Sequence, residues 1–226
     1  MPVSAQPVRR SRRRRKRQRH SPIPLLLLAA VLAAGVWIFT QDPLSWFGPK
    51  EPPELPEWVT EDLIPVNQYS RPGEALTQVD GIVVHYVGNP GTTAQNNRDY
   101  FASLAETGER SASSHFVVGL EGEILQCVPL DEIAYCSNDR NWDTISIECC
   151  HPDEEGRFTQ ETYDSLVRLV AFLADYYGLD REQIIRHYDV TGKLCPIYYV
   201  EHEDAWEAFR DAVQSSRKSG LAKLFS

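Results

Sequence analysis

Acidic residues are absent from the first twenty positions of this chain of 226 residues, whereas nine of those positions are Arg or Lys. The remainder has the opposite balance, because 14 of the 23 basic residues then stand against 32 acidic ones, a formal charge of −18. Blocks of like charge repel, so residues 1–20 are predicted to form a disordered basic tail. The acidic remainder argues against electrostatic capture by anionic polymers.

Charge of either sign is also missing from residues 23–39, and the first acidic residue of the chain is Asp42. At 1.5 Å per residue this apolar run spans roughly 27 Å, close to the hydrocarbon thickness of a bilayer. Residues 21–40 are therefore predicted to be a transmembrane anchor, with the basic tail cytoplasmic and the following domain extracellular. Secretion after cleavage near Ala33-Ala34-Gly35 is the alternative. Because a span follows the arginines directly, no nucleic-acid partner is expected.

Cysteine is scarce and odd in number, with five residues, so at least one thiol is free or bound to a metal. Cys149 and Cys150 are neighbours and cannot comfortably pair, whereas Cys127 and Cys136 are a candidate pair that the sequence leaves open. Six prolines between positions 41 and 66 predict a stiff linker. Its aromatic residues, which include Trp58, suggest that part of it docks on the domain.

No internal repeat is visible in residues 67–215, where strand patterns alternate with helical ones. A capping box formed by Thr92 and Gln95 is expected to open a helix that runs to about residue 105. Strands interleaved with helices indicate a single α/β domain with a central mixed β-sheet flanked by helices, followed by a tail at 216–226. The predicted strands lie at 77–87, 114–119, 123–128 and 144–150, and the further helices at 159–177 and 205–213. A short helical turn that begins at Asp180 is expected to lead into residues 184–187.

Polar side chains interrupt the apolar strands at two positions. His85 lies near the end of a buried strand, where its ordinary role is a hydrogen bond to a backbone carbonyl. Glu148 follows Ile147 and precedes Cys149, and a buried carboxylate needs a partner, either a salt bridge or a metal-bound water. A metal-bound water would make Glu148 a general base.

His187 and Cys195 can converge only if the chain between them, which contains Gly192, loops back. Imidazole and thiolate are preferred zinc ligands, and an open catalytic site needs only three protein ligands. Lys193 is ordinarily solvated, but beside a ligand it can stabilise an oxyanion.

Four motifs occur in one order along the domain, namely Gly81-Ile-Val-Val-His85-Tyr, Ser113-Ser-His115-Phe-Val-Val, Asp143-Thr-Ile-Ser-Ile-Glu148 and His187-Tyr-Asp-Val-Thr-Gly-Lys193-Leu-Cys195-Pro196. Together they resemble the zinc-dependent N-acetylmuramoyl-L-alanine amidase family, which includes phage lysozyme-like amidases and peptidoglycan recognition proteins. The resemblance implies Zn²⁺ held by His85, His187 and Cys195, with Glu148 and Lys193 as catalytic residues. The implied reaction is hydrolysis of the amide between N-acetylmuramic acid and L-alanine in peptidoglycan. The protein is expected to be a monomer.

The chain departs from that family at two places. Phage-type members carry a catalytic tyrosine where this chain has Ser114, and many relatives have an aromatic followed by histidine where it has Tyr135-Cys136. The candidate substrate contacts are Ser114, His115, Tyr135 and Asn89.

Two other functions are compatible with these residues. A non-catalytic peptidoglycan-binding module of the same fold is one, although such members typically lose the cysteine that matches Cys195. A cysteine hydrolase using Cys195 with His187 is the other; it needs an exposed, activated thiolate, which Pro196 disfavours. His151 and His202 lie in acidic segments and are expected to be exposed.

Overall fold

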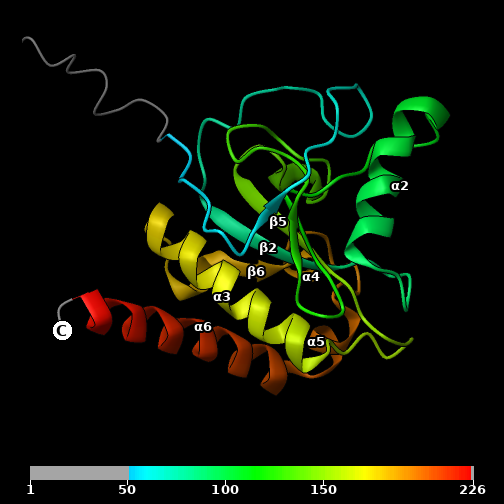
Figure 1. Cartoon of the computed structure of the whole chain (residues 1–226). Helices are drawn as coiled ribbons and strands as arrows, with labels where there is room; N and C mark the ends of the chain where they lie inside the picture. The colour runs from blue at the N-terminus through cyan, green and yellow to red at the C-terminus, as the bar shows by residue number, and fades with distance from the viewer. Residues whose placement is uncertain (1–50, 225–226) are drawn as a thin grey trace, which may run out of the picture. The chain divides into compact units, whose positions relative to one another are not determined.

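One mixed β-sheet organises residues 51–224, the part of the chain that the computed structural model describes (Figure 1). Its strands lie in the order β1-β4-β3-β5-β2-β6. β3 and β4 form an antiparallel hairpin, and the other neighbouring strands pair in parallel. The prediction of an α/β domain built on a mixed sheet is confirmed. The strands are β1 Thr60–Glu61, β2 Gly81–Tyr86, β3 Phe116–Val118, β4 Ile124–Gln126, β5 Thr144–Cys149 and β6 Ile184–Arg186.

Helices cover both faces of the sheet. α3 and α6 pack together on one face, and α2 lies on the other (Figure 1). Thr159 caps α3 by accepting a hydrogen bond from the Thr162 amide, and Gly178 ends the helix in the left-handed region at φ 70°. The helices are α2 Ala94–Thr107, α3 Gln160–Tyr177, α4 His187–Thr191, α5 Ile197–Glu201 and α6 Glu203–Leu224, with 3-10 turns η1 Asn138–Arg140 and η2 Arg181–Gln183.

The start of α2 corrects the predicted capping box by one residue. Thr93, not Thr92, accepts a hydrogen bond from the backbone of Asn96, whose side chain in turn accepts one from the Thr93 amide. The Thr92 hydroxyl instead donates to the Asn89 carbonyl at 2.8 Å. Thr92 therefore closes the turn after β2, and the helix begins afterwards.

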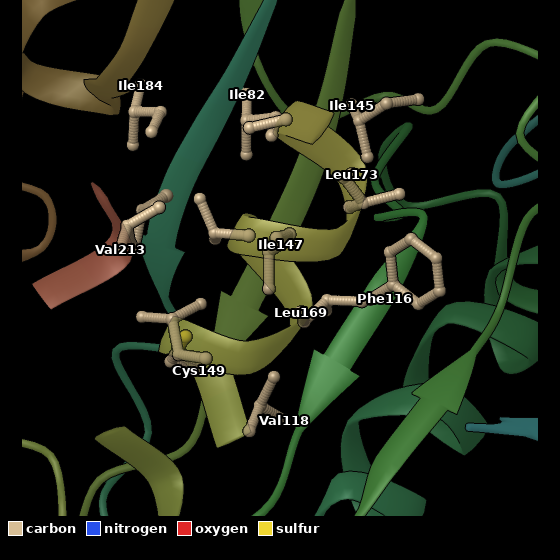
Figure 2. Packing of buried hydrophobic residues seen from close by; sticks show 14 of the residues in the cluster. Ile82, Phe116, Val118, Ile145, Ile147, Cys149, Leu169, Leu173, Ile184 and Val213 are labelled. Carbon is tan, nitrogen blue, oxygen red and sulfur yellow. The ribbon is translucent and has the colours of Figure 1, made fainter. Parts of the chain in front are cut away.

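The alternation of side chains along β2 and β5 divides their residues between the two faces. Ile82 in β2 and Ile145 and Ile147 in β5 belong to the core beneath α3, where they meet Leu169 and Leu173 (Figure 2). The residues between them point to the face that carries α2. This alternation brings His85 and Glu148 to the α2 side of the sheet.

Part of the proline-rich stretch belongs to the folded domain. β1 pairs with β4, and the Ile64 side chain is fully buried. Trp58 lies edge-on to Phe172 with ring centroids 6.1 Å apart, and the guanidinium of Arg168 lies 4.1 Å from the Trp58 ring centroid. The expected docking of this stretch is thus present, and residues 58–64 are an integral part of the sheet and core.

The C-terminal helix is longer than predicted. α6 continues to Leu224, so most of the stretch assigned to a tail at 216–226 is helical. All five cysteines are free thiols, and the candidate pair of Cys127 and Cys136 does not form.

The basic tail at 1–20 and the anchor at 21–40 lie outside the described residues, and both stay predictions. Within residues 51–224, no helix is both long enough and apolar enough to cross a bilayer.

Candidate active site

Three parallel strands deliver the candidate residues to one edge of the sheet. β5, β2 and β6 are adjacent and parallel, so their carboxyl ends share that edge. His85 lies near the end of β2, directly opposite Glu148 in β5. His187 follows the last residue of β6 and begins α4. Residues more than a hundred positions apart in sequence therefore meet.

A return loop brings Cys195 to the same place. Gly192 ends α4 at φ 77°, and its amide donates to the Tyr188 carbonyl at 2.7 Å. The Tyr188 amide donates to the Cys195 carbonyl at 3.0 Å, which fastens the returning chain beside α4. The prediction that this segment loops back is confirmed.

The three candidate ligands form a compact, buried set. The Nδ1 atoms of His85 and His187 are 3.1 Å apart, and the Cys195 Sγ lies 3.9 Å from the His85 Nδ1. A tetrahedral zinc ion, with Zn–N of about 2.1 Å and Zn–S of about 2.3 Å, separates two nitrogens by about 3.4 Å and a nitrogen and a sulfur by about 3.6 Å. The spacing and the chemistry of the donors therefore fit zinc.

The protonation of these groups also suits a cation. Burial, followed by the charges of His187 and Lys193, holds the pKa of His85 well below its usual value. Burial and Lys193 lower the pKa of His187 to about 4, so both rings are neutral at pH 7. Burial, then the Glu148 charge, raises the pKa of Cys195 to about 12, although the Tyr86 amide hydrogen-bonds the sulfur. A metal ion at this position would displace the thiol proton.

Glu148 is poised between its two protonation states. Burial raises its pKa to about 7, against opposing effects of a Cys136 hydrogen bond and the Lys193 charge. The Cys136 thiol donates to Oε1 at 3.5 Å, whereas Oε2 is buried and has no hydrogen-bond partner among the described residues. An acid–base group with one vacant oxygen is suited to moving a proton near pH 7.

These groups open into a groove of about 420 Å³. Glu148, His85 and His187 line one part of it, and Lys193, which is exposed, lies on its wall. Further along, the groove is bounded by Tyr100, Phe101, Arg110 and Tyr135.

The candidate substrate contacts divide. Tyr135 lines the groove, whereas Ser114, His115 and Asn89 are not part of its lining. The Ser114 hydroxyl is buried and donates to the Phe116 carbonyl at 2.8 Å. His115 is buried in the core, 1% exposed.

One histidine outside the site contradicts its prediction. His151 was expected to be exposed and is 1% exposed, with its ring against Tyr86 at a centroid distance of 4.9 Å. The acidic residues after it are exposed, but the histidine itself turns inward and its Nδ1 donates to the Asp153 carbonyl. His202 is exposed as expected.

Sequence reasoning missed two residues that touch the candidate ligands. Ser137 Oγ lies 3.1 Å from His85 Nε2, and Asn138 Oδ1 lies 2.8 Å from His187 Nε2. Both belong to the loop before β5, and no motif in the sequence marks them.

Two neutral imidazoles and a thiol around one point, beside a carboxylate in an open groove, are typical of hydrolases that use a metal-bound water. Residues 75–198 match the family described as N-acetylmuramoyl-L-alanine amidase. The chain belongs to the N-acetylmuramoyl-L-alanine amidase family.

Individual relatives agree with this assignment. N-acetylmuramoyl-L-alanine amidase CwlL of Bacillus licheniformis is 38% identical over 170 residues, covering 70% of this chain and 47% of the relative. The chain thus spans about half the length of the curated relatives it matches. Among solved structures, PlyL has a TM-score of 0.61 at 23% identity, covering 70% of this chain and 98% of PlyL. The catalytic domain of XlyA has a TM-score of 0.57 at 25% identity, covering 69% and 98%.

Proposed function

We propose that this protein is a zinc-dependent N-acetylmuramoyl-L-alanine amidase that cuts peptidoglycan between N-acetylmuramic acid and the L-alanine of the stem peptide. The observation that carries the proposal is the convergence of His85, His187 and Cys195 on one point beside Glu148. Membership of the amidase family supports the choice of bond, because it connects this donor set with one substrate class.

His85, His187 and Cys195 are the residues that would hold the zinc ion. When bound, zinc supplies a Lewis acid for the scissile carbonyl and lowers the pKa of a coordinated water. The donor set leaves room for such a water because it contains three protein ligands and faces the groove.

Glu148 is the proposed acid–base residue. The Glu148 carboxylate, which lines the groove, accepts the proton of the attacking water and then gives a proton to the departing alanine nitrogen. Lys193 lies on the groove wall, where its ammonium group stabilises the negative charge that develops on the carbonyl oxygen. The position of the family's catalytic tyrosine is occupied by Ser114, which is buried in the core. No side chain at that position therefore shares in the stabilisation.

A cysteine hydrolase receives less support from the same geometry. Cys195 is 2% exposed, and its pKa of about 12 keeps the metal-free thiol protonated. A nucleophilic thiol requires access to substrate and a lowered pKa, and Cys195 has neither feature.

The proposed setting is the outer face of the cell membrane. The predicted anchor at 21–40 would place the domain outside the cytoplasm, where the peptidoglycan substrate lies. Residues 51–57 would then form the described end of the spacer between the anchor and the sheet.

Mass spectrometry of peptidoglycan digested with the purified protein tests the proposal. The expected products are stem peptides with a free L-alanine amino group and glycan strands with intact lactyl groups. A chelator should abolish their release, and added zinc should restore it. Binding to peptidoglycan without release would support the non-catalytic module, and inhibition by thiol alkylation without chelator sensitivity would support the cysteine hydrolase.

A further inference from the structure

Three consecutive residues each contact a different member of the candidate site. The Cys136 thiol donates to Glu148 Oε1 at 3.5 Å, Ser137 Oγ lies 3.1 Å from His85 Nε2, and Asn138 Oδ1 lies 2.8 Å from His187 Nε2. Consecutive residues rarely serve one site in this way, because their side chains ordinarily diverge. The 136–141 loop must therefore hold one defined backbone conformation.

Asn141 and an unusual backbone conformation give the loop that geometry. Asn141 Oδ1 accepts hydrogen bonds from the amides of Cys136 at 3.0 Å and Ser137 at 2.7 Å. Asn138 adopts φ 53°, a left-handed conformation that asparagine tolerates better than most residues. Asn138 begins the turn η1, and the Thr144 hydroxyl donates to the Arg140 carbonyl, which anchors the loop to the start of β5.

The contact with Asn138 determines which nitrogen of His187 carries its proton. A carboxamide oxygen only accepts hydrogen bonds, so Nε2 of His187 must be the protonated nitrogen. Its Nδ1 then carries the lone pair, and that lone pair points toward the Nδ1 of His85. The Ser137 hydroxyl, which can donate or accept, lies within hydrogen-bond distance of His85 Nε2 and can accept the Nε2 proton when His85 Nδ1 binds a metal. The Asn138 contact thus selects, and the Ser137 contact accommodates, the tautomer in which Nδ1 is free to bind a metal.

We propose that Ser137 and Asn138 are positioning residues that hold His85 and His187 in the tautomer and ring orientation required for zinc. The inference rests on the proposed zinc site. Partners on the outer nitrogen of a ligating histidine typically change metal affinity by about 10–100-fold when they are removed. Ser137 is 1% exposed, so water does not readily replace its hydroxyl.

Variants of the full chain separate this role from a structural one. Asn138→Gly removes the acceptor and keeps the left-handed backbone accessible, and Ser137→Ala removes the hydroxyl. Zinc affinity, measured by competition with a chromophoric chelator, should fall about 10-fold or more in each variant. Asn138→Asp retains an acceptor and should restore affinity close to that of the unaltered chain. Asp139→Ala is the matched control, because Asp139 is exposed in the same loop and has no hydrogen bond or ion pair in the described structure.

A second measurement does not depend on metal or turnover. Nitrogen-15 NMR of the zinc-free protein should show His187 as the Nε2–H tautomer, and Asn138→Gly should mix the two tautomers. Unchanged zinc affinity in Ser137→Ala and Asn138→Gly, or an Nδ1–H tautomer of His187 in the unaltered chain, would overturn the positioning role while leaving the zinc site intact. Failure of the unaltered chain to bind zinc would overturn both the zinc site and this inference.

Discussion

At the scale of single residues, Glu148 has an environment unlike that of any surface carboxylate. It stands opposite His85 across two parallel strands, one of its oxygens has no partner, and its pKa is raised to about 7. An unpaired buried carboxylate weakens the fold, so its presence here is better explained by chemistry than by stability.

Glu148→Gln is predicted to keep the shape of the site and lose the proton transfer. Release of stem peptide should fall by about 10²–10⁴-fold, the range typical of a lost general base, while bound zinc is retained. Turnover and metal content measured on the same sample check both statements. Glu106→Gln, on the exposed side of α2, is the control and should leave both unchanged. A Glu148→Gln protein with nearly full activity would remove Glu148 from the mechanism.

His115 illustrates a titratable residue that serves the fold. Its Nδ1 accepts a hydrogen bond from the Ser146 amide at 3.0 Å, and its Nε2 donates to the Glu132 carbonyl at 2.9 Å. Burial lowers its pKa to about 4, although the carbonyl and the charge of Glu132 favour the cation. Protonation of Nδ1 would break the bond to Ser146.

Stability is therefore predicted to fall as the pH drops from about 6.5 toward 4. In that window an unfolded histidine binds a proton that folded His115 does not. The free energy of unfolding therefore falls, by up to about 3 kcal/mol for this residue. Urea unfolding of the metal-free protein at several pH values measures the slope. His115→Gln should be less stable at pH 7 but should show a shallower dependence. An equal slope in both proteins would refute the assignment to His115.

At the scale of elements, the main strands and helices follow from sequence patterns because each has a simple periodicity. The apolar run that ends at His85 predicts β2, and the helical spacing that ends at Gly178 predicts α3. The strand β1 escapes such reasoning, because two residues in a proline-rich stretch have no period. Its pairing depends on the distant hairpin strand β4.

The residues of the candidate site also differ in whether the sequence predicts them. His85, Glu148, His187 and Cys195 stand out by chemical type and by resemblance to a family, and the structure brings them together. The contacts of Ser137 and Asn138 with the histidine rings exist only after the chain has folded. His151 shows the opposite error, since the acidic residues around it suggested exposure and tertiary packing buried it. Ser114, a candidate substrate contact by resemblance to the family, is also buried.

Trp58→Ala is predicted to loosen β1 without disturbing the site. Losing the contacts with Phe172 and Arg168 should lower the free energy of unfolding by about 1–3 kcal/mol, since Trp58 is only partly buried. Hydrogen exchange should accelerate at the amides of Asp62 and Ile64, which bond to β4 and the residue after it. Val66→Ala, at a side chain 64% exposed, is the control. Unchanged exchange would show that Trp58 does not hold β1.

At the scale of the whole molecule, the candidate metal site joins segments that are far apart in the chain. His85 lies near the end of β2, the 136–141 loop precedes β5, His187 begins α4 and Cys195 follows that helix. A ligand that binds only the folded form stabilises it by mass action, by about 4 kcal/mol when free ligand is 1,000 times its Kd.

Removal of zinc is accordingly predicted to lower the melting temperature of the protein. The Nδ1 atoms of His85 and His187 face each other at 3.1 Å, an arrangement that a bound cation stabilises. Without the cation that stabilisation is lost, and the Cys195 thiol, whose pKa is about 12, takes up a proton. Calorimetry with and without chelator measures the change in melting temperature. The melting temperature of Cys195→Ser should change little when chelator is added. A melting temperature that does not change when chelator is added would mean that no metal is bound at this site.

The most direct test of the proposed zinc-dependent amidase activity is a titration of metal-free protein with zinc, in which bound zinc and released stem peptide are measured together. Release of stem peptide should rise in proportion to bound zinc and stop rising at about one ion per chain, as expected for one three-ligand site. Full activity in the zinc-free protein, or one bound ion per chain with no release of stem peptide, would contradict it.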